Sequence, residues 1–199
     1  MINCLLAGVG GQGIVLASKL LAHAAMSKGL KVRTAETIGM AQRGGCVVSH
    51  VRMGEALYSP LISYKSADVV IGFEPAEAVR SLSYLKEDRT VIVSRKAIKP
   101  VTDSLSNLDY DGEDMLNYLD SHVLRLVVVD SNAIFVECGS EKVLNIALLG
   151  AAVAAGELGI TLEDMEKTIT DMLPQRFIEM NLRALRAGAI TVLKEESIG

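Results

Sequence analysis

A short apolar run that enters a glycine cluster and leaves it as a helix is the feature that most limits what this chain can fold into. Residues 2–7 are apolar, residues 8–13 read GVGGQG, and residues 14–26 carry apolar side chains at helical spacing. A second strand is expected at 30–34, just ahead of Glu36. This order predicts a βαβ unit, the building block of α/β folds.

The rest of the chain continues this alternation and then becomes helical. Further strands are expected at residues 46–51, 67–73, 90–94 and 124–129, with a hairpin partner at 56–58. Glu74 and Pro75 predict a helix start, whereas residues 95–110 lose periodicity and are expected to be irregular, and His122 is expected in a polar turn. Three helix caps are expected beyond the last strand, at Asp130 or Ser131, at Ser140, and at Thr161 with Asp164, and a long final helix is expected over 174–194.

These patterns predict an α/β fold with a Rossmann-like, mostly parallel sheet, helices on both faces and a helical C-terminal portion. No segment has the composition of a linker, so one domain is expected over residues 1–199. A chain of this length can bury about 70% of its unfolded surface. Residues 146–156 are apolar all round, so this helix must be covered on every side by its own sheet or by another subunit.

Composition excludes several classes of function. A net charge of −4, with only five Tyr, three Phe and no Trp, argues against a nucleic-acid surface. The apolar run is too short for a membrane span and the first residues lack a basic leader region, so a cytoplasmic protein is expected. Cys4, Cys46 and Cys138 form no C-x-x-C pair, which favours a reducing compartment, and the three histidines have no ligand spacing. Neither a metal site nor a catalytic residue is therefore expected.

Two glycine-rich loops are the candidate binding residues. In the first, Gly8, Gly10, Gly11, Gln12 and Gly13 fit G-x-G-x-x-G between a strand and a helix, where backbone N–H groups can hold an anion. The alternative is that these glycines only permit a tight turn. Glu36 could meet a ribose, which keeps open an independent NAD(P)-dependent oxidoreductase or a nucleotide-sensing protein.

The second loop holds Gln42, Arg43, Gly44 and Gly45 and is expected at the carboxyl edge of the sheet. The forked guanidinium of Arg43 could clamp a phosphate or a carboxylate. The alternative is that Arg43 binds loop carbonyls or a partner chain.

Taken together, the motifs resemble a known family over essentially the whole chain. GVGGQG at 8–13, GMAQRGG at 39–45, VSHVR at 48–52, SPLI at 59–62, ADVVIGFEP at 67–75 and LPQRFIEMNL at 173–182 are similar to the gamma-type subunit of the 2-oxoacid:ferredoxin oxidoreductases. The SPLI and GFEPAEA stretches resemble most closely the version called the beta subunit of the indolepyruvate ferredoxin oxidoreductases.

The resemblance implies a subunit of an enzyme that joins a 2-oxoacid, here an aryl pyruvate, to coenzyme A and passes electrons to ferredoxin. It implies that thiamine diphosphate and iron–sulfur clusters are held by a larger partner subunit, and that this chain is inactive alone. The sequence agrees, since it has no Gly-Asp-Gly signature and fewer cysteines than a cluster needs. A hetero-oligomer is implied, with a homodimer as the alternative for the isolated chain. Only the two glycine-rich loops are carried over, as binding candidates.

Overall fold

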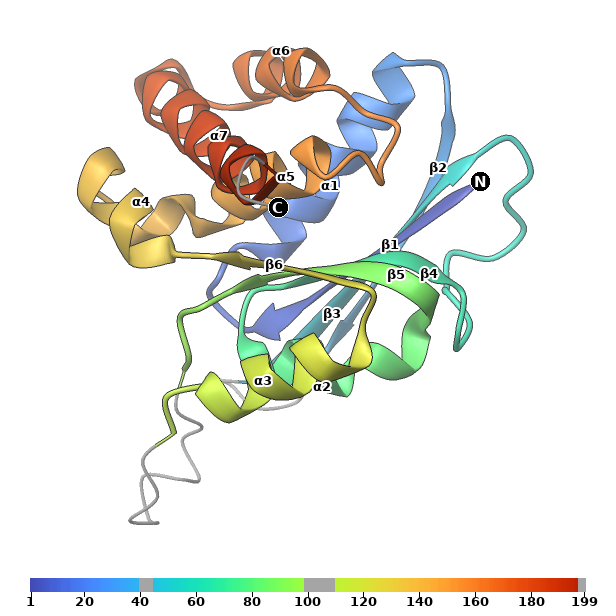
Figure 1. Cartoon of the computed structure of the whole chain (residues 1–199). Helices are drawn as coiled ribbons and strands as arrows, with labels where there is room; N and C mark the ends of the chain where they lie inside the picture. The colour runs from blue at the N-terminus through green and yellow to red at the C-terminus, as the bar shows by residue number, and fades with distance from the viewer. Residues whose placement is uncertain (40–44, 99–109, 197–199) are drawn as a thin grey trace.

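The computed structural model describes residues 1–39, 45–98 and 110–196, which form a sheet with helices on both faces (Figure 1). The sheet has six strands in the order β2-β3-β1-β4-β5-β6. The strands are β1 (Ile2–Val9), β2 (Lys31–Ile38), β3 (Cys46–Gly54), β4 (Ala67–Gly72), β5 (Leu85–Ser94) and β6 (Arg125–Val129). The expected α/β class is confirmed.

The helices divide unequally between the two faces of the sheet. In Figure 1, α2 and α3 lie below the sheet and the remaining helices lie above it. The helices are α1 (Ile14–Ser27), α2 (Pro75–Arg80), α3 (Glu113–His122), α4 (Ser131–Cys138), α5 (Leu144–Ala154), α6 (Leu162–Met172) and α7 (Gln175–Glu196), with short 3-10 turns η1 (Leu82–Tyr84) and η3 (Glu141–Val143). Among these described helices, we find none with the length and apolar character that crossing a membrane requires.

Strand β3 corrects the expected βαβ unit. It lies between β1 and β2 and runs antiparallel to both, whereas β1, β4, β5 and β6 are parallel neighbours. Only residues 39–45 separate β2 from β3, and a parallel crossover needs about 10 residues or more. The chain therefore turns back from β2 into an antiparallel pair, and β1 and β2 are not adjacent.

The hairpin partner expected at 56–58 is also wrong, because both edges of β3 are already occupied by β1 and β2. The segment belongs to a loop, and the backbone of the loop residues that follow it is held by side chains of β3. Arg52 donates to the carbonyl oxygens of Ser59 (2.8 Å) and Leu61 (3.3 Å), and Nδ1 of buried His50 accepts from the N–H of Ile62 (3.2 Å). Burial lowers the pKa of His50, which favours the neutral ring that this bond requires.

Helix α3 was not expected from the sequence, and it places His122 at a helix end rather than in a polar turn. The helix follows Gly112, whose φ is +87°, and it carries Glu113 and Asp114 in its first turn. Only two of its residues, Leu116 and Leu119, are buried, so too few apolar side chains recur at helical spacing to reveal the helix in the sequence. The acidic start was the available signal, since carboxylates favour a helix N-terminus.

Several predicted helix starts are confirmed. Pro75 is at the first position of α2, and the carboxylate of Glu74 accepts from the N–H of Glu77 at 3.0 Å. Asp130 caps α4, while Thr161 and Asp164 form a capping box at α6. Ser140 caps η3, which leads directly into α5.

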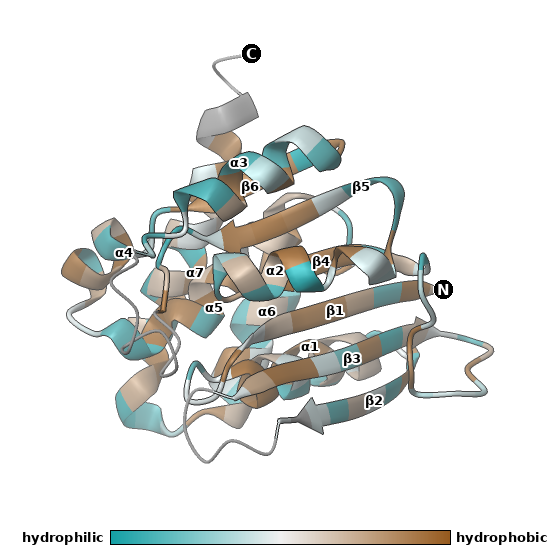
Figure 2. Cartoon of the chain, turned by 90° about the horizontal axis from the view of Figure 1, so that it is seen from below, coloured by the Kyte–Doolittle hydropathy of each residue, from teal (hydrophilic) through white to brown (hydrophobic). Residues whose placement is uncertain are grey.

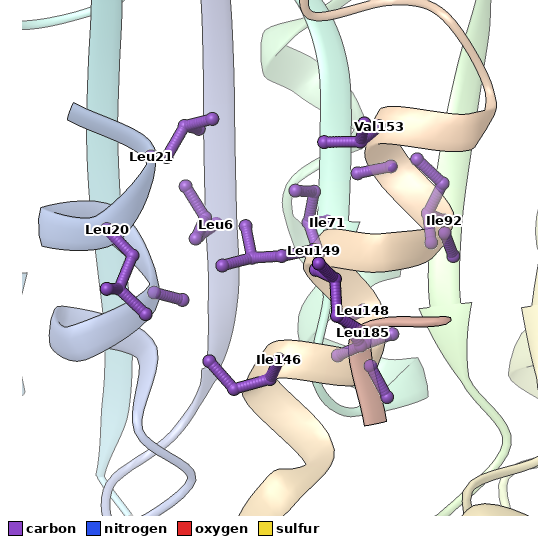
Figure 3. Close-up of a cluster of buried hydrophobic side chains, with 14 of the residues drawn as sticks. Leu6, Leu20, Leu21, Ile71, Ile92, Ile146, Leu148, Leu149, Val153 and Leu185 are labelled. Atoms are coloured by element: carbon purple, nitrogen blue, oxygen red, sulfur yellow. The ribbon is translucent and has the colours of Figure 1, made fainter. Parts of the chain in front are cut away.

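The core has one cluster on each face of the sheet. The larger cluster lies under α1, α5 and α7 and receives alternate strand residues such as Leu6, Ile71 and Ile92 (Figure 3). The smaller cluster, under α2 and α3, receives Leu5 and Val70, which point the other way. Helix α5 is buried over residues 144–153 within its own chain. The apolar run therefore needs no other subunit to cover it.

Two glycines allow α5 and α7 to pack backbone against backbone. A Cβ added at Gly150 would collide with the carbonyl of Leu185, and one added at Gly188 would collide with the carbonyl of Ala147. Both positions lie in helices, where glycine costs about 0.5 to 1 kcal/mol relative to alanine. Close approach of the two helices is the reason that glycine is needed here.

We predict that Gly150→Ala lowers the free energy of unfolding by about 1 to 3 kcal/mol, because the methyl group overpacks the contact with Leu185. Chemical denaturation of the full chain measures this. Helix propensity alone predicts the opposite sign, so a stabilised variant would contradict the close packing of α5 on α7.

Candidate functional site

A cleft of about 550 Å³ opens where β1 ends and α1 begins. Its other walls come from the residues after β5, from α4, from η3 and from the start of α5. The residues that line it are Gly10, Gly11, Gln12, Gly13, Leu16, Lys96, Ile98, Phe135, Glu141, Lys142, Leu144 and Asn145. This position, at the carboxyl ends of parallel strands, is where α/β folds bind ligands.

The turn from β1 to α1 requires glycine at several positions. Gly11 and Gly13 have φ values of +98° and +80°, which other residues rarely adopt. A Cβ at Gly8 would lie 2.6 Å from Oε1 of Gln12, and one at Gly13 would lie 2.7 Å from Nδ2 of Asn145. At Gly11 the space is open, so its backbone faces the cleft without a covering side chain.

The N-terminus of α1 is left uncapped in the described part of the chain. Gly13 at the cap position has no side chain to offer, and the first turn holds no acidic residue. Within the described residues, the N–H groups of Ile14, Val15 and Leu16 have no hydrogen-bond acceptor. These free donors, with the positive end of the helix dipole, are suited to an anion.

The structure brings together the ends of the two predicted glycine-rich loops. The N–H of Gly10 donates to the carbonyl of Gly45 at 2.9 Å, so Gly45 lies directly beside the first loop. Gln42, Arg43 and Gly44 lie outside the described residues.

The side chain of Gln12 bonds to the sheet. Its Oε1 accepts from the N–H of Val9 at 2.7 Å, and its Nε2 donates to the carbonyl of Phe73 at 2.8 Å. Both polar atoms of this carboxamide are therefore occupied within the protein.

The polar and aromatic residues on the other walls of the cleft were missed by sequence reasoning. Lys96 follows β5, and its Nζ lies 2.6 Å from Oε2 of Glu141 and 5.1 Å from the centre of the Phe135 ring. Lys142 follows the cap of η3, and buried Asn145 donates to the carbonyl of Gly13 at 3.4 Å. The available signal was their place just after strands or helix caps, at the edge where the glycine loop opens.

The position of Glu36 does not match a dinucleotide site. In that fingerprint the acid follows the strand next to the glycine loop. Here β3 lies between β1 and β2, and Oε1 of Glu36 lies 3.5 Å from Oγ of Ser18 on α1. The observation removes the main structural support for NAD(P) binding.

An acidic cluster lies at the start of α2, beside the first residue of β3. Glu74 and Glu77 are both buried; Tyr110 donates to Glu74, and Arg80 pairs with Glu77. Burial, followed by the neighbouring Glu77 carboxylate, raises the pKa of the Cys46 thiol to about 12. The thiol is therefore held in its protonated, unreactive form.

Comparison with known families shows which family the chain belongs to. The family described as pyruvate ferredoxin/flavodoxin oxidoreductase matches residues 3–190. The chain belongs to this family. Within the pyruvate ferredoxin/flavodoxin oxidoreductases it is a small subunit.

Among these relatives, the chain is 35% identical over 188 residues to the indolepyruvate oxidoreductase subunit IorB of Archaeoglobus fulgidus, covering 94% of this chain and 93% of that one. Two solved structures share the fold. The gamma subunit of a keto/oxoacid ferredoxin oxidoreductase from Geobacter sulfurreducens has a TM-score of 0.71 at 23% identity, covering 98% of this chain and 99% of that one. The 2-oxoglutarate:ferredoxin oxidoreductase of Magnetococcus marinus has a TM-score of 0.73 at 20% identity, covering 97% of this chain and 31% of that one.

We predict that Cys46 reacts with iodoacetamide at pH 8 about a thousand times more slowly than a free cysteine, because little thiolate exists so far below a pKa of about 12. Replacing Glu77 by Gln removes one cause of the raised pKa, so labelling should speed up. Mass spectrometry of the labelled peptide measures both rates.

The control for this experiment is Glu87→Gln, which makes the same change at an exposed carboxylate paired with Lys65. Labelling of wild-type Cys46 as fast as a free cysteine would contradict the assigned environment.

Proposed function

We propose that the chain, as one gamma-type domain over residues 1–199, is the small subunit of an indolepyruvate-type 2-oxoacid:ferredoxin oxidoreductase in the cytoplasm. The reaction is the oxidative decarboxylation of an aryl pyruvate with coenzyme A, giving acyl-CoA, CO2 and reduced ferredoxin. The observation that carries the proposal is the near full-length match to a subunit named for indolepyruvate. The family description names pyruvate instead, so the 2-oxoacid used is the part that experiment must decide.

The redox cofactors are assigned to a larger partner subunit. An iron–sulfur cluster needs four ligands, and this chain has three cysteines, on β1, on β3 and at the end of α4. Burial raises the pKa of Cys4 and of Cys138 as well, which disfavours the thiolate form that binds iron. The three cysteines therefore do not fit an iron–sulfur cluster. Thiamine diphosphate is assigned to the partner subunit because this sequence has no Gly-Asp-Gly signature.

The part assigned to this chain is to bind a phosphate group of coenzyme A in the cleft. The free N–H groups at the start of α1 would donate to the phosphate oxygens, and Lys142 would neutralise part of the phosphate charge. Lys96 and the ring of Phe135 form the opposite wall. Gln42, Arg43, Gly44 and Gly45 are proposed as further binding residues on the ground of their sequence motif alone. One fold relative, the Magnetococcus marinus enzyme, has been solved with coenzyme A bound.

The test is reconstitution of the complex from this chain and its large subunit. We expect 2-oxoacid-dependent ferredoxin reduction from the pair and none from this chain alone. In the pair, Lys142→Glu should raise the KM for coenzyme A about tenfold, equivalent to about 1.4 kcal/mol, with kcat retained. Lys167→Glu on α6 is the matched control, since it makes the same charge change at an exposed site outside the cleft.

Three results would count against the proposal. Activity from this chain alone would overturn the subunit assignment. An unchanged KM in Lys142→Glu would overturn the cleft as the phosphate site. Calorimetric binding of NAD⁺ or NADP⁺ by the isolated chain would favour the dinucleotide alternative.

A further inference from the structure

The pairing of β1 with β4 stops one hydrogen bond earlier than its register allows. Ala7 is opposite Gly72, and the N–H of Phe73 donates to the carbonyl of Ala7 at 2.8 Å. In a regular parallel ladder the next bond would run from the N–H of Val9 to the carbonyl of Phe73. Instead, the carboxamide of Gln12 lies between these two groups. Its Oε1 accepts from the N–H of Val9, and its Nε2 donates to the carbonyl of Phe73.

We infer that Gln12 is a positioning residue whose side-chain amide replaces one rung of the β1–β4 ladder and so sets the shape of the glycine loop. This inference rests on the proposed binding role of the cleft. The inserted amide keeps Val9 and Phe73 too far apart to bond directly, so the two strands separate at their carboxyl ends. The turn at 10–13 begins at this separation, directly above the cleft.

Gln12 also donates a hydrogen bond to a carbonyl oxygen that would otherwise repel a bound anion. The carbonyl oxygen of Phe73 carries partial negative charge at the end of β4, close to where the loop opens. The Nε2 group of Gln12 covers it, and Nδ2 of Asn145 donates in the same way to the carbonyl of Gly13. These two oxygens are thus engaged, while the N–H groups of Ile14, Val15 and Leu16 at the start of α1 stay free.

A carboxamide of this length meets both requirements at every pH, because one of its groups accepts and the other donates. The space is also closed on the side of Gly8, where a Cβ would lie 2.6 Å from Oε1 of Gln12 and 2.6 Å from Cβ of Phe73. The glycine at position 8 and the glutamine at position 12 are therefore two parts of one arrangement.

The test uses Gln12→Met, which keeps the length without hydrogen bonds, and Gln12→Glu, which can replace both bonds only when its new carboxyl is protonated. Burial against the Phe73 carbonyl raises the pKa of that carboxyl above its unfolded value of about 4.3. Its bond to the Phe73 carbonyl is thus present at low pH and is lost as the pH rises through the folded pKa, while the carboxylate still accepts from the N–H of Val9. Glu74, directly after Phe73, and Lys96, Glu141 and Lys142 around the cleft are the ionisable neighbours, and both variants retain them.

The first measurement is hydrogen exchange of the Val9 amide in the full chain, relative to Gln175→Glu at an exposed position of α7. We expect exchange about tenfold faster in Gln12→Met at all pH values, and protection close to that of the wild type in Gln12→Glu, whose carboxyl group accepts from the N–H of Val9 in either protonation state. The same rate in all variants would overturn the inserted rung.

The second measurement is the KM for coenzyme A in the reconstituted complex, where we expect a rise of about tenfold in Gln12→Met with kcat retained. An unchanged KM, while Lys142→Glu raises it, would overturn the positioning role but leave the proposed function intact. If neither Gln12→Met nor Lys142→Glu changes the KM, the phosphate site itself fails, while faster Val9 exchange would still support the inserted rung.

Discussion

The replaced rung between β1 and β4 is the constraint on which the candidate site depends. These strands pair in parallel at the centre of the sheet, and Gln12 ends their ladder by bonding to Val9 and Phe73. The geometry of the glycine loop follows from this point, because the strands have separated before the turn begins. A regular rung there would draw Phe73 onto Val9 and close the space that the carboxamide fills.

The helices that pack on one face of the sheet support the glycine loop. Helix α5 is buried against the sheet, α1 and α7, and glycines at 150 and 188 let two helix backbones meet. Asn145, at the start of α5, reaches back to Gly13 and joins this helical layer to the loop. In contrast, no described helix covers β2 and β3 on the face of the sheet that Figure 2 turns toward the viewer. The helical layer that contains α1, α5 and α7 is therefore the part of the molecule that stabilises the cleft.

The sequence predicted the element types well where they depend on local chemistry. The strand, turn and helix at residues 2–26, the proline start of α2 and the capping box at Thr161 all follow from patterns within a few residues. The place of β3 did not follow, since the neighbours of a strand depend on contacts between distant segments. Helix α3 was missed because only two of its side chains are buried.

In the candidate site, too, local motifs were predictable from the sequence and long-range contacts were not. The glycine loop was visible as a motif, but the inward turn of Gln12 depends on Phe73, which is 61 positions away. Lys96, Phe135 and Lys142 carry no motif, and only the fold brings them to the loop. Family membership rests on the near full-length match, whereas the role of each residue rests on these contacts.

The most direct test of the account is nuclear magnetic resonance of the backbone amides during titration with coenzyme A. We predict that the N–H signals of Gly11 and Gly13 shift and saturate, while those of Gly29 and Gly156, which lie outside the cleft, do not move. Signals of Gly11 and Gly13 that stay unchanged in the reconstituted complex at saturating coenzyme A would contradict the account.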